Sequence, residues 1–119
     1  MLKLTISEDN LKLIAQTLEF QSRVLCGQLG EVEYLFRFYT DRKYDVELVE
    51  NKLREIKKEI FKSDFNVGIY SQEAKGIPFD CYELYKQIQH HFHKNDSYWN
   101  VHKDGIMVSD KNKIEVIKK

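Results

Sequence analysis

Hydrophobic residues at alternating steps of four and three predict a long helix over residues 8–40. A heptad pattern of this kind marks a helix with one continuous apolar seam. Ser7 is suited to cap the helix, and the acidic Glu8 and Asp9 follow in the first turn, where the helix dipole favours anions. The seam, which only Ser22 interrupts, consists of Leu11, Ala15, Leu18, Ser22, Leu25, Leu29, Val32, Phe36 and Tyr39.

This helix is long for a small domain, and it contains two glycines. A straight helix over residues 8–40 would measure about 50 Å, whereas a domain of this size has a radius of gyration near 13 Å. Either the helix bends or breaks at Gly27–Gly30, or a second copy of the chain covers its excess length. On an unbroken helix, Arg23, Gly27, Gly30 and Tyr34 share one face, and the glycines leave a notch for a backbone, a partner helix or a ligand. A helix–turn–helix break with glycine as the C-cap explains the glycines equally well.

Two further helices are expected. Asp45 is suited to cap a helix whose apolar stripe holds Val46, Val49, Leu53, Ile56 and Ile60. The short connection Asp41–Tyr44 should fold this helix back antiparallel on the first one. The segment 61–78 is long and irregular, which is typical of functional or disordered loops, and its apolar residues favour order. A third helix follows over residues 79–94, with a stripe of Cys81, Leu84, Tyr85, Ile88 and either Phe92 or His91.

Alternating apolar and polar residues predict short strands near both ends of the chain. The strands would cover residues 2–6, about 105–109 and about 113–118, with Asp110–Asn112 as a hairpin turn. We therefore predict one α+β domain over residues 1–119. It would contain an antiparallel helical hairpin, a third helix, and a small antiparallel sheet formed by the N-terminal strand and the C-terminal hairpin.

The charge balance, the apolar runs and the cysteines of the chain limit the classes of function that it can have. The 19 basic and 19 acidic residues balance, which argues against a general nucleic-acid binder. No apolar run approaches the length of a membrane span and the start shows no signal peptide, so we expect a cytoplasmic protein. Cys26 and Cys81 occupy apolar positions without a CxxC spacing. This pattern favours buried reduced thiols over a disulfide and excludes a thiolate zinc site.

The sequence offers little catalytic chemistry. His90, His91 and His93 could contribute to a metal site, but a catalytic centre would need a third ligand such as His102, Asp96 or Asp104. A packed His91 with His90 and His93 at the surface is the favoured alternative. No phosphate loop, dinucleotide fingerprint or nucleophile elbow is present. We therefore predict no catalytic residue, no metal site and no cofactor.

Aromatic, amide and cationic residues around the glycines and the long loop form a candidate ligand site. Aromatic faces combined with hydrogen-bonding and cationic groups suit a planar anionic ligand such as a nucleotide. The alternative is that these residues lie at the edge of the core or in an interface. The predicted ligand-binding residues are Arg23, Gln28, Tyr70, Tyr85, His90 and Trp99.

Two loose patterns resemble small, mostly uncharacterised proteins of phages and prophages. One is S-R-x-x-x-G-Q, within LKLIAQTLEFQSRVLCGQLGEVEYLF, and the other is Y-x-x-Y-x-x-I-x-H after a G-I loop. Gln89 stands where the family pattern has an arginine, which puts an anion-binding role of that position in doubt. The resemblance implies a mobile-element context rather than an activity. It covers most of the chain and points to Ser22, Arg23, Gly27, Gln28, Gly68, Ile69, Tyr82, Tyr85, Ile88, His90 and Trp99.

Three functions follow from these observations. The first is a small non-enzymatic, homo-oligomeric binding module that sequesters an anionic nucleotide-type signal, which in a phage would be an anti-defence sponge. The second is a protein–protein interaction module that inhibits a host protein. The third is a metal-dependent hydrolase centred on His90, His91 and His93.

Overall fold

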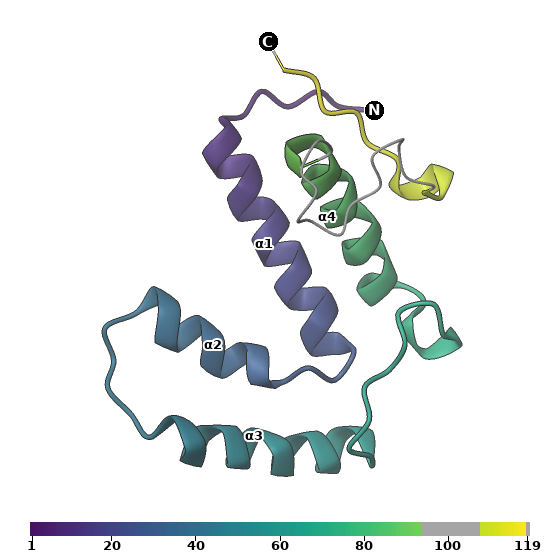
Figure 1. Ribbon diagram of the computed structural model, residues 1–119. Coiled ribbons are helices and arrows are strands. Elements are labelled where there is room, and N and C mark those ends of the chain that lie inside the picture. Colours follow the sequence, from purple (N-terminus) through teal and green to yellow (C-terminus); the bar gives the residue numbers. More distant parts are fainter. Residues whose placement is uncertain (94–107, 119) are drawn as a thin grey trace.

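Two helices from distant parts of the sequence form the most extensive contact of the fold. In the computed structural model, which describes residues 1–93 and 108–118, α1 (Glu8–Leu25) runs antiparallel to α4 (Ile77–His93) (Figure 1). Ser7 caps α1 as predicted, since its Oγ accepts a hydrogen bond from the Asn10 N–H at 3.2 Å. The α1–α4 interface holds a buried cluster of Ala15, Tyr85 and Ile88, surrounded by Leu11, Leu18, Tyr82 and Phe92.

The long first helix is broken at its glycines. α1 ends at Leu25, and α2 (Gly30–Tyr39) leaves in a new direction. Gly27 has a φ of +102°, and the backbone N–H groups of Gly27 and Gln28 donate to the Val24 and Arg23 carbonyls at 3.0 and 2.9 Å. This is a Schellman motif, which satisfies the last carbonyls of a helix and favours glycine at the left-handed position. The length of the predicted helix left two alternatives open, a bend or break at Gly27–Gly30 or coverage by a second copy of the chain. The structure shows the break.

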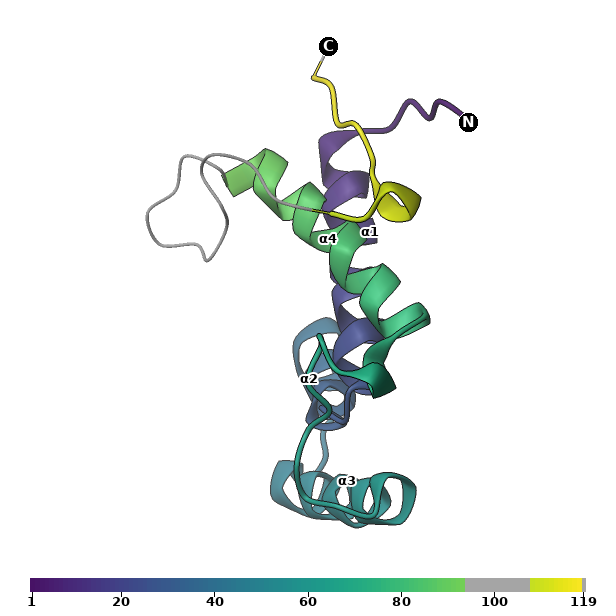
Figure 2. The same cartoon turned by 90° about the vertical axis from the view of Figure 1, so that its right-hand side faces the viewer.

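α2 and α3 (Val46–Phe61) form an antiparallel pair that we call the α2–α3 arm, residues 30–61. The predicted hairpin is thus confined to α2 and α3, while α1 pairs with α4. Asp45 caps α3 as predicted, accepting from the Leu48 N–H at 3.1 Å. Inside the arm, the buried Glu33 carboxylate accepts from the Tyr44 hydroxyl at 2.7 Å and lies 3.2 Å from Arg37 Nε. Figure 2 shows the arm at the end of the molecule remote from both termini.

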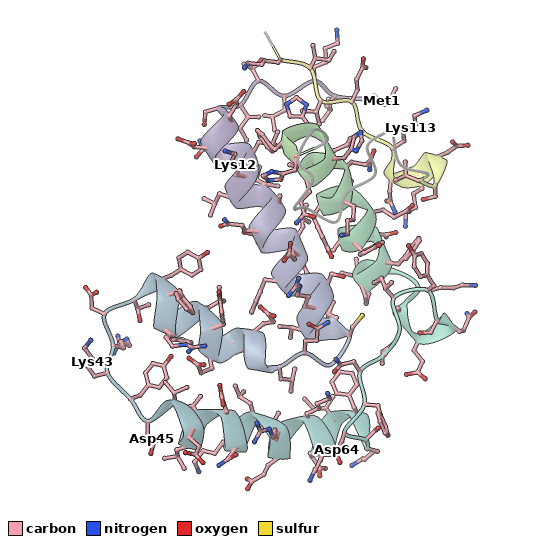
Figure 3. All side chains as sticks on the ribbon, in the orientation of Figure 1. Met1, Lys12, Lys43, Asp45, Asp64 and Lys113 are labelled. Atoms are coloured by element: carbon pink, nitrogen blue, oxygen red, sulfur yellow. The ribbon has the colours of Figure 1, made fainter. Side chains whose placement is uncertain are left out.

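The arm gives the molecule an open shape. The radius of gyration is 16.3 Å, compared with about 13.5 Å expected for a compact domain of this length. α3 contains no buried residue at all. Asp45 and Asp64 flank α3 in Figure 3, and side chains project from the helix along its length between them. The α1–α4 pair therefore supplies most of the core.

The predicted α+β class and its antiparallel sheet are wrong, because the described residues contain no strand. Residues 2–6 are unpaired, and Asp110–Asn112 forms the short 3-10 helix η2 instead of a hairpin turn. Most of the strand expected at about 105–109 lies outside the described residues. Over 108–118, side chains of α4 take the hydrogen bonds that a partner strand would have made: Gln87 Oε1 accepts from the Ile114 N–H at 2.9 Å. The alternating apolar and polar residues of this segment therefore reflect its packing against α4, and not the pairing of strands.

The loop between α3 and α4 is ordered, as its apolar residues suggested. It contains the 3-10 helix η1 (Gln72–Ala74), and Ala74 is fully buried. The Val67 N–H donates to the Cys26 carbonyl at 2.8 Å, which fastens the loop to the corner between α1 and α2. α4 begins at Ile77, two residues earlier than predicted.

Candidate functional site

A pocket of about 360 Å³ lies at the corner between α1 and α2. Its volume falls in the range of small-molecule sites, which is about 300–1,000 Å³. Three parts of the chain build its walls: the end of α1 with the corner, the loop before α4, and α4 itself. The lining residues are Ser22, Arg23, Cys26, Gln28, Val67, Ile69, Tyr82 and Tyr85.

The loop packs closely against Gly27, whereas nothing packs against Gly30. A Cβ built on Gly27 would lie 3.4 Å from both Asn66 Oδ1 and Lys57 Cε, two atoms that themselves belong to a contact between α3 and the loop. Lys57 Nζ donates to Asn66 Oδ1 at 2.5 Å. A Cβ on Gly30 would meet nothing within 4 Å. The predicted notch is therefore a close approach at Gly27 alone.

Ser22, which interrupts the apolar seam, joins α1 to the start of α4. Its side chain is buried, and its Oγ donates to the Pro78 carbonyl at 2.9 Å. The hydrogen bond satisfies a hydroxyl that would otherwise be costly to bury. Ser22 thus fixes one wall of the pocket against another.

Arg23 is the cation that lines the pocket, and two carboxylates already hold it. Its Nη2 lies 3.0 Å from Glu19 Oε1, and its Nη1 donates to Glu31 Oε1 at 3.1 Å. Burial works against the charged guanidinium, but Glu19 and Glu31 outweigh it, so the pKa of Arg23 is raised. A phosphate group at Arg23 would therefore compete with two carboxylates.

Tyrosine rings form the α4 side of the pocket. The Tyr82 and Tyr85 rings meet edge to face at 5.6 Å, and the hydroxyls of Tyr82 and Tyr70 lie 3.2 Å apart. Burial raises the pKa of Tyr85 to about 12, with Glu19 adding to the effect and Arg23 opposing it. Burial and the Tyr70 hydroxyl also raise the pKa of Tyr82. Both hydroxyls stay protonated at neutral pH and can donate hydrogen bonds.

The structure brings together three of the six predicted ligand-binding residues, namely Arg23, Gln28 and Tyr85. Tyr70 stands beside the pocket, in contact with Tyr82, but does not line it. His90 lies farther along α4 and lines a different pocket. Trp99 lies outside the described residues.

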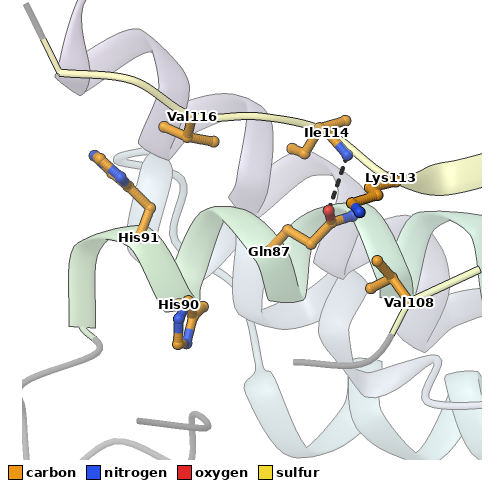
Figure 4. A pocket seen from close by; sticks show the side chains of 7 residues that line it. All are labelled: Gln87, His90, His91, Val108, Lys113, Ile114 and Val116. Carbon is orange, nitrogen blue, oxygen red and sulfur yellow. Dashed lines mark hydrogen bonds between the residues drawn. The ribbon is translucent and has the colours of Figure 1, made fainter. Parts of the chain in front are cut away.

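The second pocket, of about 270 Å³, lies between α4 and the C-terminal segment. Figure 4 shows His91 on the side of α4 that faces Val116, and His90 on another side of the helix. Among residues 1–93 and 108–118, no group of three or more His, Cys, Asp or Glu side chains is placed to hold a metal ion. The third ligands considered from the sequence, Asp96, His102 and Asp104, lie outside these ranges.

A polar stripe on α4, which sequence reasoning missed, holds the C-terminal segment. The buried Glu83 carboxylate accepts from the Ser109 N–H at 2.8 Å, from the Ser109 hydroxyl, and from Asn112 Nδ2 at 2.9 Å. Gln87 Nε2 donates to the Asn112 carbonyl at 2.7 Å. Burial works against the charged carboxylate, but these hydrogen bonds prevail and lower the pKa of Glu83. The spacing of Asp80, Glu83 and Gln87, at steps of three and four, was the available signal.

Comparison of the chain with protein-family models, curated proteins and solved structures gave no match. The resemblance to phage and prophage proteins therefore stays a prediction. Within the part of the chain that the structure describes, no helix combines the length and hydropathy needed to cross a membrane. Cys26 and Cys81 are both buried and free, as their apolar positions predicted.

Proposed function

We propose that the protein is a non-enzymatic binding module that takes a small planar ligand in the pocket at the α1–α2 corner. The observation that carries this proposal is the convergence of Arg23, Gln28 and Tyr85 on one pocket of suitable volume. Aromatic walls with a few hydrogen-bonding groups are typical of sites that bind small molecules.

The chemistry of the walls favours the ring of a nucleoside-type ligand. Tyr82 and Tyr85 offer aromatic surface and protonated hydroxyls, and Gln28 offers an amide that can both donate and accept. Because Glu19 and Glu31 neutralise Arg23, the pocket itself carries no surplus positive charge for a phosphate. A nucleotide would therefore bind through its base, and its phosphate would contribute little to affinity.

The buried thiol in the pocket supports binding rather than catalysis. Cys26 lines the pocket, but burial raises the pKa of its thiol. The thiolate is the nucleophilic form of cysteine, and a raised pKa keeps it rare at neutral pH. Cys26 is therefore suited to packing against a ligand and not to attacking it.

Calorimetric titration with matched nucleosides, nucleoside 5′-monophosphates and cyclic nucleotides tests this proposal. We expect a nucleoside and its monophosphate to bind with similar affinity, and Gln28→Ala to weaken both. Gln16→Ala, the same change at an exposed position of α1 that does not line the pocket, is the matched control. Failure of every compound to bind a correctly folded protein would overturn the proposal.

Inhibition of a host protein is the competing hypothesis, and capture experiments separate the two. A small-ligand module should recover no stoichiometric protein partner from host lysate, whereas an inhibitor should recover one that Gln28→Ala does not release. The nucleotide-signal and anti-defence roles are narrower forms of the binding proposal. They require the preferred ligand of the titration to be a signalling nucleotide.

A further inference from the structure

The α2–α3 arm leaves an apolar face of α3 uncovered. Leu48, Ile56 and Ile60 are exposed by 51%, 47% and 63%. Together with Lys52 they are spaced four residues apart along α3. Residues four apart lie on adjoining turns of a helix face. We call the face formed by Leu48, Lys52, Ile56 and Ile60 the α3 seam. Contiguous apolar surface of this kind marks an interaction site.

We propose that the α3 seam binds the α3 seam of a second copy of this chain, with the two helices antiparallel. A two-fold axis would cross α3 at its midpoint, next to Leu53. Such an isologous contact uses the same surface twice, so the surface must be complementary to itself. This inference is independent of the ligand pocket, which lies at the α1–α2 corner.

The charges along α3 have this self-complementarity. With the axis at the helix midpoint, Lys52 of one copy stands opposite Glu55 of the other. Asp45, just before the helix, stands opposite Lys62, just after it. In this register no charged residue from 45 to 62 faces a residue of the same sign. Each opposite-charge pair also occurs twice, because the axis repeats it.

The apolar residues agree with the same register. Leu48 lies within one residue of Ile60 of the other copy, and Ile56 lies beside the aliphatic stem of Lys52. Long cationic side chains can cover apolar surface with their methylene groups while keeping the charge in water. A parallel arrangement would instead place Lys52 beside Lys52 and Glu55 beside Glu55, which is unfavourable.

Lys52 and Glu55 are well placed for the pairing because both are exposed and neither has an ion-pair partner within residues 1–93 and 108–118. Lys58 and Lys62, by contrast, already approach Asp64 and Glu59 at 3.6 and 3.2 Å. Lys52 and Glu55 are therefore free to be reversed without breaking a contact of the monomer.

Charge reversal, read by analytical ultracentrifugation, tests the proposal. The wild-type protein should sediment as a species of twice the 14.3 kDa chain mass. Lys52→Glu alone, or Glu55→Lys alone, places like charges opposite each other at two symmetric positions and should weaken the dimer about tenfold. An equimolar mixture of the two variants should associate more tightly than either variant alone, because each then meets the opposite charge.

Arg54→Glu is the matched control. It reverses a charge on the same helix, but Arg54 lies two residues from Ile56 and therefore, at about 100° per residue, on the opposite side of α3. We expect it to leave the dimer unchanged. A wild-type protein that is monomeric at high micromolar concentration would overturn the proposal. So would a mixture that associates no better than its components, which is the result expected if another macromolecule covers the seam.

Discussion

The Ser22 hydroxyl donates a hydrogen bond to the Pro78 carbonyl at 2.9 Å and so connects two residues that are 56 positions apart. The bond joins the last turns of α1 to the first turn of α4, at the point where the two helices enclose the pocket. It also explains why a polar residue stands in an otherwise apolar seam.

Ser22→Ala should therefore destabilise the protein by about 1–2 kcal/mol, because a buried hydrogen bond is lost. Ser22→Leu, which completes the apolar heptad, should also destabilise the protein, since it leaves the Pro78 carbonyl without its hydrogen-bond donor. Urea denaturation measures both. Ser71→Ala removes an exposed serine–carbonyl hydrogen bond to Gly68 and should change stability by less than about 0.5 kcal/mol. Equal effects of Ser22→Ala and Ser71→Ala would contradict this account.

The two glycines that looked equivalent in the sequence should respond in opposite ways to alanine. Gly27→Ala forces a side chain into a backbone with a φ of +102° and against the loop, and should cost about 1–2 kcal/mol. Gly30→Ala adds a methyl group in open space at the first residue of α2 and should stabilise by up to about 1 kcal/mol. Thermal unfolding of the two variants shows whether each substitution raises or lowers the stability of the protein. A neutral Gly27→Ala would show that the corner does not need its left-handed residue.

Acid should release the C-terminal segment before it unfolds the helices. The pKa of Glu83 is lowered from its ordinary 4.5, so its carboxylate contributes stability that is present above pH 4.5 and lost as the pH falls through the lowered pKa. Protonation removes acceptors for Ser109 and Asn112. Amide hydrogen exchange should then show loss of protection at Ser109 and Ile114 while α1 stays protected.

Glu83→Gln should reproduce this release at neutral pH, at a cost of about 1–3 kcal/mol. Glu73→Gln is the control, because Glu73 is exposed on η1 and contacts no part of the segment. Persistent protection of Ser109 in Glu83→Gln would show that packing alone holds the segment.

Alkaline conditions should weaken the α1–α4 pair through Tyr85. The pKa of Tyr85 is raised from 10 to about 12, so its neutral form contributes stability that is fully present below pH 10 and lost as the pH rises through about 12. Tyr85→Phe removes the ionising hydroxyl and should flatten the decline over that window. The measurement is the urea midpoint against pH, with the exposed Tyr34→Phe as control. An unchanged slope in Tyr85→Phe would assign the decline to other groups.

The sequence predicted the helices well where local signals act alone. Ser7 and Asp45 cap the helices that their side chains indicated, since capping depends on a few neighbouring backbone groups. Gly27 ends α1 for an equally local reason. Arg23 and Gln28 were grouped by their nearness to the glycines, and both line the pocket at the break.

The errors arose where distant segments decide the outcome. The alternation near the C-terminus is the same for a strand and for an extended segment on a helix, and only Glu83 and Gln87 decide between them. The pairing of α1 with α4, rather than with α3, depends on contacts such as Ser22–Pro78 that no local pattern reveals. The neutralisation of Arg23 likewise needs Glu31, which approaches only because the helix breaks.

The arrangement of the α1–α4 pair around the arm also constrains the order of folding. Docking α1 on α4 closes a loop that contains both helices of the arm, and the entropy cost of closure grows with the length of flexible chain between the docking points. A preformed α2–α3 hairpin shortens that flexible length, because its own contacts are local. We therefore expect the arm to form early and the main core late, so that the least buried part of the molecule guides the assembly of the most buried part.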